Sequence, residues 1–290
     1  MDTIINVENL TCLVGNRAIL SNIDWKIKKG DHWVVFGLNG SGKTTLLHIL
    51  MGLYQPNAGQ VEILGKTFAE EERFLHNITG VVLQERLYED YMTLQENANY
   101  YGRFYSNYKE AYFLQLLKKY GLDPKQKYKH LSKGEELKFQ FAFALAHYPK
   151  LLLLDEPTGN FDPEFREEFL ADVKDFIRDG EHTVILATHL TDDLDKMADY
   201  LVYLESGTVL LATDIETLRE NYRIVAGENY KMQLLPEKRI IYMEQGAFAT
   251  KALVRHRKID TYDMSYTVSA PTIEEFMYFV TKRKAGVELC

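Results

Sequence analysis

The stretch HWVVFGLNGSGKTTLLHIL at residues 32–50 decides the fold class of the chain. An apolar run rich in valine ends in glycine, and the leucines that follow residue 44 recur at helical spacing. Between these two elements, residues 37–44 fit the pattern G-x-x-x-x-G-K-[ST]. Strand, glycine-rich loop and helix therefore follow one another directly, which is the context that this pattern requires.

The loop at residues 37–44 has the chemistry of a phosphate site. Its glycines let backbone N–H groups point at phosphate oxygens, and the following helix adds the positive end of its dipole. Lys43 supplies a point charge, and Thr44 supplies a hydroxyl ligand for Mg²⁺. The predicted nucleotide-binding residues are Asn39, Gly40, Ser41, Gly42, Lys43, Thr44 and Thr45. The alternative is a glycine-rich turn with a chance lysine, which leaves the flanking strand and helix unexplained.

Two adjacent carboxylates follow a second buried strand, in KLLLLDEP at residues 150–157. Asp155 and Glu156 thus lie at the carboxyl end of that strand, where ligands bind in open parallel sheets. We expect Asp155 to hold Mg²⁺ through water and Glu156 to polarise an attacking water, which favours hydrolysis over transfer to a second substrate. The alternative is a helix-capping pair beside Pro157.

Two further polar residues end predicted strands. Gln84 follows ITGVVL, and His189 follows the apolar run TVILAT. Because parallel strands place their carboxyl ends at one edge of a sheet, we expect both side chains near the phosphate loop. A histidine in this position is, taken alone, more often structural than functional, so the assignment depends on the other motifs.

The remaining elements predict an α/β fold of the P-loop NTPase type, with a mixed or parallel sheet core. In NIDWKIK at residues 22–28, apolar and polar residues alternate, which predicts an antiparallel β portion. Buried strands then alternate with helices such as the one in residues 161–180, which requires crossover connections. Residues 198–212 read as a hairpin around Ser206 and Gly207.

The composition excludes several classes of protein. With 290 residues and 46% hydrophobic content, the chain can bury a substantial core. A formal net charge of -8 argues against nucleic acid as a partner. Cys12 and Cys290 form neither a disulfide framework nor a metal-ligand pattern, which fits a reducing, cytoplasmic setting. We see no apolar run of roughly 20 residues and no signal-peptide pattern, so we expect the chain to act from outside the bilayer.

Taken in order, the phosphate loop, VVLQE, LSKGE, LLLLDEPTGNFD and ATH resemble the ATPase subunit of ABC transporters over about residues 4–220. The resemblance implies an ATP-hydrolysing subunit, with Mg²⁺, that powers transport through a separate membrane-spanning permease at the cytoplasmic face of the membrane. Two cassettes, identical or different, would meet head to tail as a dimer. Weaker similarity in LSKGEELK and in the tail PTIEEFMYF suggests the exporter-like group, whose cargoes are often peptides, lipids or antimicrobials.

The same resemblance implies roles for individual residues. Gln84 would sense Mg²⁺ and the membrane partner, Glu156 would activate water, and His189 would read the γ-phosphate. Ser132, Gly134 and Glu135 would contact the nucleotide of the second cassette, and Asp162 would bridge the two chains. The predicted domains are an ATPase domain at residues 1–221, with a helical subdomain inserted at about 85–146, and a C-terminal α+β extension at 222–290 that ends in a helix.

Three positions depart from the family pattern. The signature has Lys133 for its first glycine and Glu135 for its glutamine, and we expect Lys133 to face phosphate and to offset Glu135. Val14 stands where many members stack an aromatic ring on adenine, which predicts weaker ATP binding or a relaxed choice of nucleotide.

Some alternatives remain open from the sequence. The aromatic residues between Tyr88 and Tyr105 predict either a groove for a helix of the permease or an ordinary helical core. The chain could also be an ABC-type ATPase without a transporter, although it has a single cassette and no heptads. A third reading is a regulatory module that holds ATP without hydrolysis, which Glu156 argues against.

Overall fold

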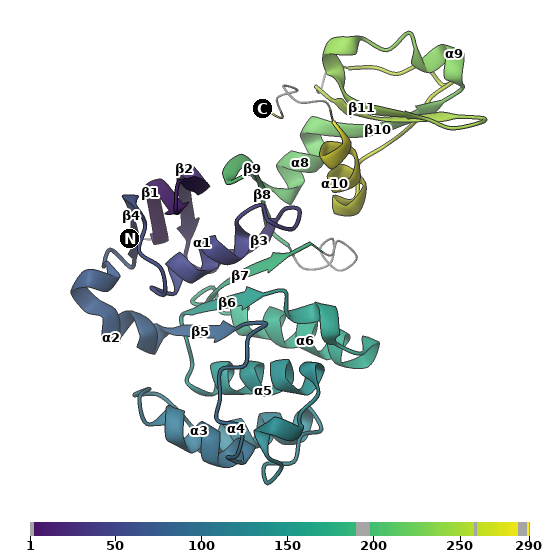
Figure 1. Cartoon of the computed structure of the whole chain (residues 1–290). Coiled ribbons are helices and arrows are strands. Elements are labelled where there is room, and N and C mark those ends of the chain that lie inside the picture. Colours follow the sequence, from purple (N-terminus) through teal and green to yellow (C-terminus); the bar gives the residue numbers. More distant parts are fainter. Residues whose placement is uncertain (1–2, 190–197, 258–259, 284–288, 290) are drawn as a thin grey trace. The chain divides into compact units, whose positions relative to one another are not determined.

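The structure is a computed structural model that describes residues 3–189, 198–257, 260–283 and 289 (Figure 1). The chain forms two compact units. The first comprises Met1–His189 and Tyr203–Val209, and the second comprises Leu190–Val202 and Leu210–Cys290. Cys290 and the last residue of the predicted final helix, Lys284, lie outside the described residues. The domain boundary after residue 221 stays a prediction.

An antiparallel sheet opens the first unit. It contains β1 (Thr3–Val14), β2 (Arg17–Lys28) and β4 (Ala58–Ile63) in the order β2-β1-β4. Ile23, Trp25 and Ile27 of β2 are buried, while the polar residues between them are exposed. The alternation read from the sequence therefore corresponds to one buried face of this sheet.

A second, six-stranded sheet carries the predicted motifs. Its strands are β3 (His32–Phe36), β5 (Thr79–Val82), β6 (Leu151–Asp155), β7 (Thr183–Thr188), β8 (Tyr200–Glu205) and β9 (Thr208–Asp214), in the order β5-β6-β7-β3-β8-β9. The ladder from β5 through β6 and β7 to β3 is parallel. Every residue of β3, β6 and β7 is buried, as expected for strands covered on both faces. Because these strands run the same way, the loops after β3, β6 and β7 meet at one edge.

The helices of the first unit follow the strands in an α/β order. They are α1 (Lys43–Leu50), α2 (Phe68–Ile78), α3 (Leu94–Gly102), α4 (Glu110–Lys119), α5 (Lys133–Ala146) and α6 (Pro163–Ile177), with short 3₁₀ turns at Tyr128–His130 and Pro157–Asn160. Helices α3, α4 and α5 lie between β5 and β6 in the chain and pack together, as expected for the inserted helical part (Figure 1). The contact between α4 and α5 is aromatic, with Phe113 of α4 against Phe139 and Phe143 of α5.

The second unit contains a four-stranded antiparallel sheet with helices, which confirms the predicted α+β extension. The strands β10 (Tyr222–Gly227), β11 (Ile240–Gln245), β12 (Thr250–Arg255) and β13 (Thr267–Ser269) have the order β11-β12-β10-β13. The helices are α8 (Ile215–Asn221), α9 (Asn229–Met232), a 3₁₀ turn at Glu237–Arg239, and α10 (Ile273–Lys282). Phe276 of α10 packs against Tyr222, while Val225 belongs to a second cluster with Met232. No described helix is both long and apolar enough to cross a bilayer.

Candidate nucleotide site

The phosphate loop connects β3 to α1 and is shaped by glycine. Gly42, at the N-cap of α1, has φ 108° and ψ 4°, a left-handed conformation that side chains with a Cβ rarely adopt. A Cβ there would also lie 2.8 Å from Leu20 Cδ2. The first turn of α1 contains no acidic residue, so the helix N-terminus is suited to an anion.

Lys43 is buried at the centre of this loop, with 6% of its surface exposed. Its ammonium group donates a hydrogen bond to the carbonyl of Gly37 at 2.8 Å and lies 3.7 Å from Oε1 of Glu156. Burial lowers the pKa of Lys43, whereas Glu156 and Asp155 favour its charged form. The loop therefore places the Lys43 ammonium group close to the carboxylates of Asp155 and Glu156.

Asp155 ends β6 and fits the predicted magnesium role. It is 4% exposed, and burial raises the pKa of its carboxyl, while a hydrogen bond with Thr44 opposes that shift. Within the described part of the chain, Asp155 Oδ1 is a buried atom without a hydrogen-bond partner. Mg²⁺ prefers oxygen ligands and is often held by one or two protein oxygens together with substrate phosphates and water. The Asp155 carboxylate and the Thr44 hydroxyl supply oxygen ligands of this kind.

Glu156 and His189 form a close pair at the ends of neighbouring strands. Glu156 has φ 49°, a strained conformation for a residue other than glycine. Its Oε2 lies 2.8 Å from Nδ1 of His189 and accepts hydrogen bonds from the His189 N–H and the Thr188 hydroxyl, each at 3.3 Å. The adjacent β6 and β7 thus bring together two residues that are far apart in the sequence.

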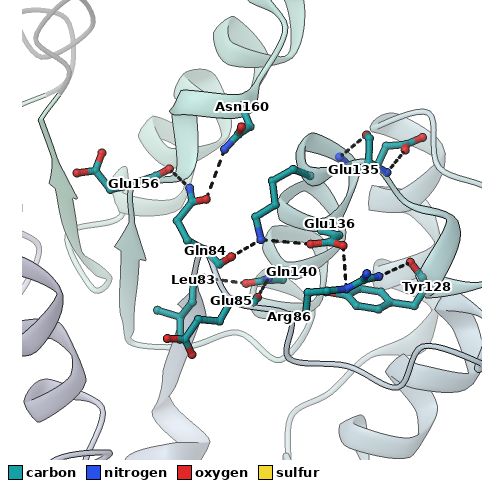
Figure 2. A network of polar contacts seen from close by, with 12 residues as sticks. Leu83, Gln84, Glu85, Arg86, Tyr128, Glu135, Glu136, Gln140, Glu156 and Asn160 are labelled. Atoms are coloured by element: carbon teal, nitrogen blue, oxygen red, sulfur yellow. Dashed lines mark hydrogen bonds and ion pairs between the residues drawn. The ribbon is translucent and has the colours of Figure 1, made fainter.

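Gln84 reaches the same edge from β5. Its Nε2 donates to the carbonyl of Glu156 at 2.5 Å, and Nδ2 of Asn160 donates to its Oε1 at 3.4 Å (Figure 2). The structure therefore brings Gln84, Glu156 and His189 together, as the strand ends predicted. Their catalytic roles stay predictions.

The signature residues begin a different helix. Ser132 is the N-cap of α5 and forms a capping box with Glu135, in which Ser132 N–H donates to Glu135 Oε2 at 2.7 Å and Glu135 N–H donates to Ser132 Oγ at 3.3 Å. A Cβ on Gly134 would lie 2.7 Å from the carbonyl oxygen of Asn160, so this close approach requires glycine. Among the described residues, no hydrogen bond or ion pair joins Ser132 or Glu135 to the phosphate loop.

Lys133 does not offset Glu135 as we expected from the sequence. Its ammonium group donates to the carbonyl of Gln84 and lies 3.2 Å from Oε2 of Glu136. The reason is that Glu135 is occupied as the capping partner of Ser132, whereas the buried Glu136 lies beside Lys133 on the helix face that meets β5. The prediction that Lys133 offsets Glu135 is therefore wrong in this structure.

Asp162 caps another helix. Its Oδ1 accepts from the N–H of Phe165 at 2.8 Å, and its Oδ2 lies 3.2 Å from the ammonium group of Lys138. The Phe165 N–H and then Lys138 hold the pKa of Asp162 below its usual value. Asp162 is exposed, so it remains accessible to a second chain.

Comparisons with known proteins agree with this arrangement. The family model described as "ABC transporter" matches residues 20–159. A putative ABC transporter ATP-binding protein of Streptococcus mutans is 32% identical over 225 residues, which cover 71% of this chain and 85% of that protein. The chain belongs to the family of ABC transporter ATP-binding proteins. It is an ATPase subunit that powers a transporter.

Two more members of the ABC family illustrate the similarity. The bacitracin transport ATP-binding protein of Bacillus licheniformis is 27% identical over 248 residues, which cover 84% of this chain and 80% of that protein. A solved dimeric ATP-binding cassette in a post-hydrolysis state, bound to ADP and Pi, is 26% identical with a TM-score of 0.66, and the match covers 73% of this chain and 98% of that one.

A cavity of about 400 Å³ lies beside the phosphate loop of this ABC ATPase. Arg17, Leu38 and Glu205 are among its lining residues, but Val14 is not. Val14 is 64% exposed at the end of the β1–β2 hairpin. Tyr203 is the aromatic residue among the lining residues of this cavity, and Val14 adds no ring to it.

Several residues of the ABC site were not predicted. Thr188 and Asn160 contact Glu156 and Gln84, and Lys138 pairs with Asp162. Such single polar residues carry no signal in one sequence. Glu136 and Gln140 could have been found, because their spacing places them on the same helix face as Lys133.

Proposed function

We propose that this ABC ATPase powers the export of a peptide, lipid or antimicrobial compound through a separately encoded membrane subunit. The observation that carries the hydrolytic part is the Glu156–His189 pair at 2.8 Å, next to Lys43 and the buried Asp155. The cargo class is supported by the name of the Bacillus licheniformis relative, a bacitracin transport ATP-binding protein.

In the proposed reaction, water attacks the γ-phosphorus of ATP while Glu156 accepts a proton from that water. The bond between the γ-phosphorus and the bridging oxygen breaks, which gives ADP and inorganic phosphate. Lys43 and the α1 N-terminus would bind the β- and γ-phosphates. When bound through Thr44 and Asp155, Mg²⁺ would neutralise charge that develops on the phosphate oxygens.

We assign positioning roles to the other residues at this edge. The hydrogen bonds that Glu156 accepts from the Thr188 hydroxyl and the His189 N–H fix its carboxylate. The His189 ring would then read the γ-phosphate. Gln84, whose amide donates a hydrogen bond to the Glu156 carbonyl, would sense Mg²⁺. It would transmit changes at the nucleotide site to the inserted helical part.

The site would be completed by a second cassette. Ser132, Gly134 and Glu135 begin a helix on this chain and make no described contact with its own phosphate loop, which supports a role at the nucleotide of the other chain. Asp162 would bridge the two chains. The dimeric cassette with ADP and Pi provides a precedent for pairing within the family.

An apolar groove supports the proposed membrane partner. It has a volume of about 770 Å³ and includes Leu87, Tyr101, Phe104 and Tyr105 among its lining residues. Phe104 is 61% exposed, so a large apolar side chain is available for contact. We propose that a short cytoplasmic helix of the permease binds here, which would hold the ATPase at the cytoplasmic face as a peripheral subunit.

The two tyrosines at the start of the aromatic segment do not line this groove. Tyr88 makes edge contacts with Tyr101, Tyr128 and Phe139 and belongs to the helical core. Tyr91 is 75% exposed, with the ammonium group of Lys129 4.6 Å from its ring centroid. The groove is thus formed by the later aromatics of the segment.

We keep residues 1–221 as the proposed ATPase domain and 222–290 as a proposed extension. Nucleic acid is not a proposed partner.

The direct test is ATP turnover by the purified chain. We expect hydrolysis by the wild type and a loss of at least about 100-fold in Glu156→Gln, as is typical when a group that transfers a proton is removed. Glu164→Gln, an exposed carboxylate in the first turn of α6, is the matched control and should retain full activity. Equal turnover in wild type and Glu156→Gln would refute the assigned role.

The membrane partner is tested separately. Phe104→Asp should abolish association with the membrane subunit that co-purifies with the wild-type chain, because it places a charge in an apolar groove. ATP binding by the isolated subunit should not change. Tyr91→Asp is the control outside the groove and should leave association intact; the opposite pattern would contradict the groove assignment.

A further inference from the structure

Three polar residues of helix α5 share one face of the helix. Lys133, Glu136 and Gln140 are spaced by three and four residues, which places them on one side of the helix. Glu136 is 4% exposed and Gln140 is 0% exposed. Buried polar groups of this kind need partners, and their partners here lie in the segment 83–86 that follows β5.

Gln140 holds the main chain at two points of this segment. Its Oε1 accepts a hydrogen bond from the N–H of Leu83 at 2.8 Å, and its Nε2 donates to the carbonyl of Glu85 at 3.0 Å. Both functional atoms of the amide are therefore used. The residue between these two points is Gln84 (Figure 2).

Lys133 holds Gln84 itself. Its ammonium group donates to the Gln84 carbonyl and lies 3.2 Å from Oε2 of Glu136. The other oxygen of Glu136, Oε1, lies 3.1 Å from Nε of Arg86. Glu136 is thus a buried carboxylate between two cations, and loss of either cation would leave it less compensated.

The Gln84 side chain extends away from α5. While the carbonyl of Gln84 is bound by Lys133, its amide contacts the Glu156 carbonyl and Asn160. A continuous set of polar contacts therefore connects the start of α5 to the main chain of Glu156 (Figure 2). Any displacement of the Gln84 main chain would move its amide relative to Glu156.

We propose that Lys133 is a positioning residue for ATP hydrolysis, which holds the main chain of Gln84 against α5 and so keeps the Gln84 amide on Glu156. This inference rests on the proposed function, because it assigns a consequence to the position of Glu156. It also gives a reason for the departure at this position, since glycine has no side chain that could reach the Gln84 carbonyl.

The competing role for Lys133 is direct contact with the phosphates of a second cassette. The two roles differ in kinetics. A phosphate ligand that acts equally in the ground state and the transition state changes KM, whereas a residue that positions the catalytic groups changes kcat. The contacts described above turn the ammonium group toward its own chain, which favours the second pattern.

Steady-state hydrolysis by the full chain tests the proposal. In Lys133→Met, which keeps the length of the side chain without its charge, we expect kcat to fall about 10-fold, because small displacements of catalytic groups cost up to about 100-fold. The KM for ATP should stay within about twofold. Lys133→Arg should restore most of kcat, and the exposed Lys125→Met should match the wild type.

Hydrogen exchange provides a readout that does not depend on turnover. A peptide covering residues 83–86 should exchange about 10-fold faster in Lys133→Met than in the wild type. The reason is that local opening of this segment becomes easier once the hydrogen bond from Lys133 to the Gln84 carbonyl is removed. Peptides from β6 should be unchanged, which would show that the variant is folded.

The outcomes separate this inference from the proposed function. An inactive Glu156→Gln together with an unchanged kcat in Lys133→Met would overturn only the role of Lys133. A rise in KM with unchanged kcat would instead assign Lys133 to the second cassette's nucleotide and overturn the proposal. A lower kcat without faster exchange at residues 83–86 would show that the contact with Gln84 is not the cause and would also overturn it. A fully active Glu156→Gln would overturn the proposed function and this inference together.

Discussion

Helices α1 and α5 both begin within short glycine-containing motifs, yet their first turns are built in opposite ways. At α1 the N-cap is Gly42, which offers no side chain, and the first turn contains no acidic residue. At α5 the N-cap is Ser132, and Glu135 closes a capping box on it. The N-terminal N–H groups of α1 therefore remain available for an external anion. Those of α5 are partly bound by the helix's own capping side chains.

The two helix starts should therefore contribute differently to nucleotide binding. Lys43 and the α1 N-terminus can bind phosphate through the main chain and one buried cation. The α5 N-terminus presents a hydroxyl oxygen and a carboxylate that already accept hydrogen bonds within the cap, which leaves the Ser132 O–H as a donor for a phosphate oxygen. We therefore expect α1 to dominate affinity and α5 to act only when two chains meet.

The largest expected effect comes from α1. Lys43→Met removes the buried cation of the phosphate loop and should lower ATP hydrolysis by about 1000-fold, the upper range for loss of one preorganised charge-stabilising group. Lys66→Met removes a partly exposed lysine that pairs with Glu71 and should have no effect. Comparison of initial rates at saturating ATP checks this, and similar losses in the two variants would argue against a special role for Lys43.

The far end of α5 should give the next largest effect. His147, its C-cap, is buried and contacts the carbonyls of Phe143 and Thr79. Burial lowers its pKa to about 4 from 6.5, so below pH 6.5 the unfolded chain binds a proton that the folded chain does not. Stability should therefore fall by about 3 kcal/mol between pH 7 and pH 4, since one pKa unit corresponds to about 1.4 kcal/mol.

Urea unfolding across this pH range measures the effect of His147. His147→Gln has no titrating group and should lose about 3 kcal/mol less over the same interval. Parallel pH profiles of the wild type and this variant would contradict the assignment. Ionisable groups elsewhere contribute equally to both proteins, so the difference between the profiles isolates His147.

The next effect concerns the cap at the start of α5. Ser132→Ala removes the acceptor for the Glu135 N–H and should lower the free energy of unfolding by about 1 kcal/mol. Glu135→Gln, which restores the usual family residue, should change stability by only a few tenths of a kcal/mol, because glutamine also completes a capping box. Chemical denaturation of both variants checks this, and a larger loss in Glu135→Gln would refute the capping account.

The smallest expected effect concerns binding of the adenine ring of ATP rather than of its phosphates. Val14→Tyr should strengthen ATP binding by about 1 kcal/mol, close to fivefold in Kd, if the new ring stacks on adenine. Leu13→Tyr, on a neighbouring exposed position of β1, is the control. Fluorescence titration with ATP measures both, and an unchanged Kd in Val14→Tyr would count against the stacking hypothesis.

Much of the fold could be predicted because periodicity and turn chemistry are local. The buried strands β3, β6 and β7, the hairpin at Ser206–Gly207 and the helix after Asp162 each have a signal within a few residues. The edge where Gln84, Glu156 and His189 meet could also be predicted, since parallel strands place their carboxyl ends together.

Side-chain pairing could not be predicted in the same way. The contact between Lys133 and the Gln84 carbonyl has no local signal, whereas the pairing of Lys133 with Glu136 rather than Glu135 follows from helical spacing and from the capping-box pattern Ser132-x-x-Glu135. The packing of Tyr88 in the core and of Phe104 at the groove likewise depends on how the helices meet. The packing of Tyr88 and Phe104 involves residues that are distant in the sequence.

We expect the α1 start of one chain and the α5 start of another to enclose one nucleotide. Light scattering of Glu156→Gln with and without ATP tests it most directly. We predict a shift from monomer to dimer on addition of ATP, and no shift in the double variant Glu156→Gln with Ser132→Arg. A monomer at every ATP concentration, or equal dimers with and without Ser132→Arg, would contradict the claim.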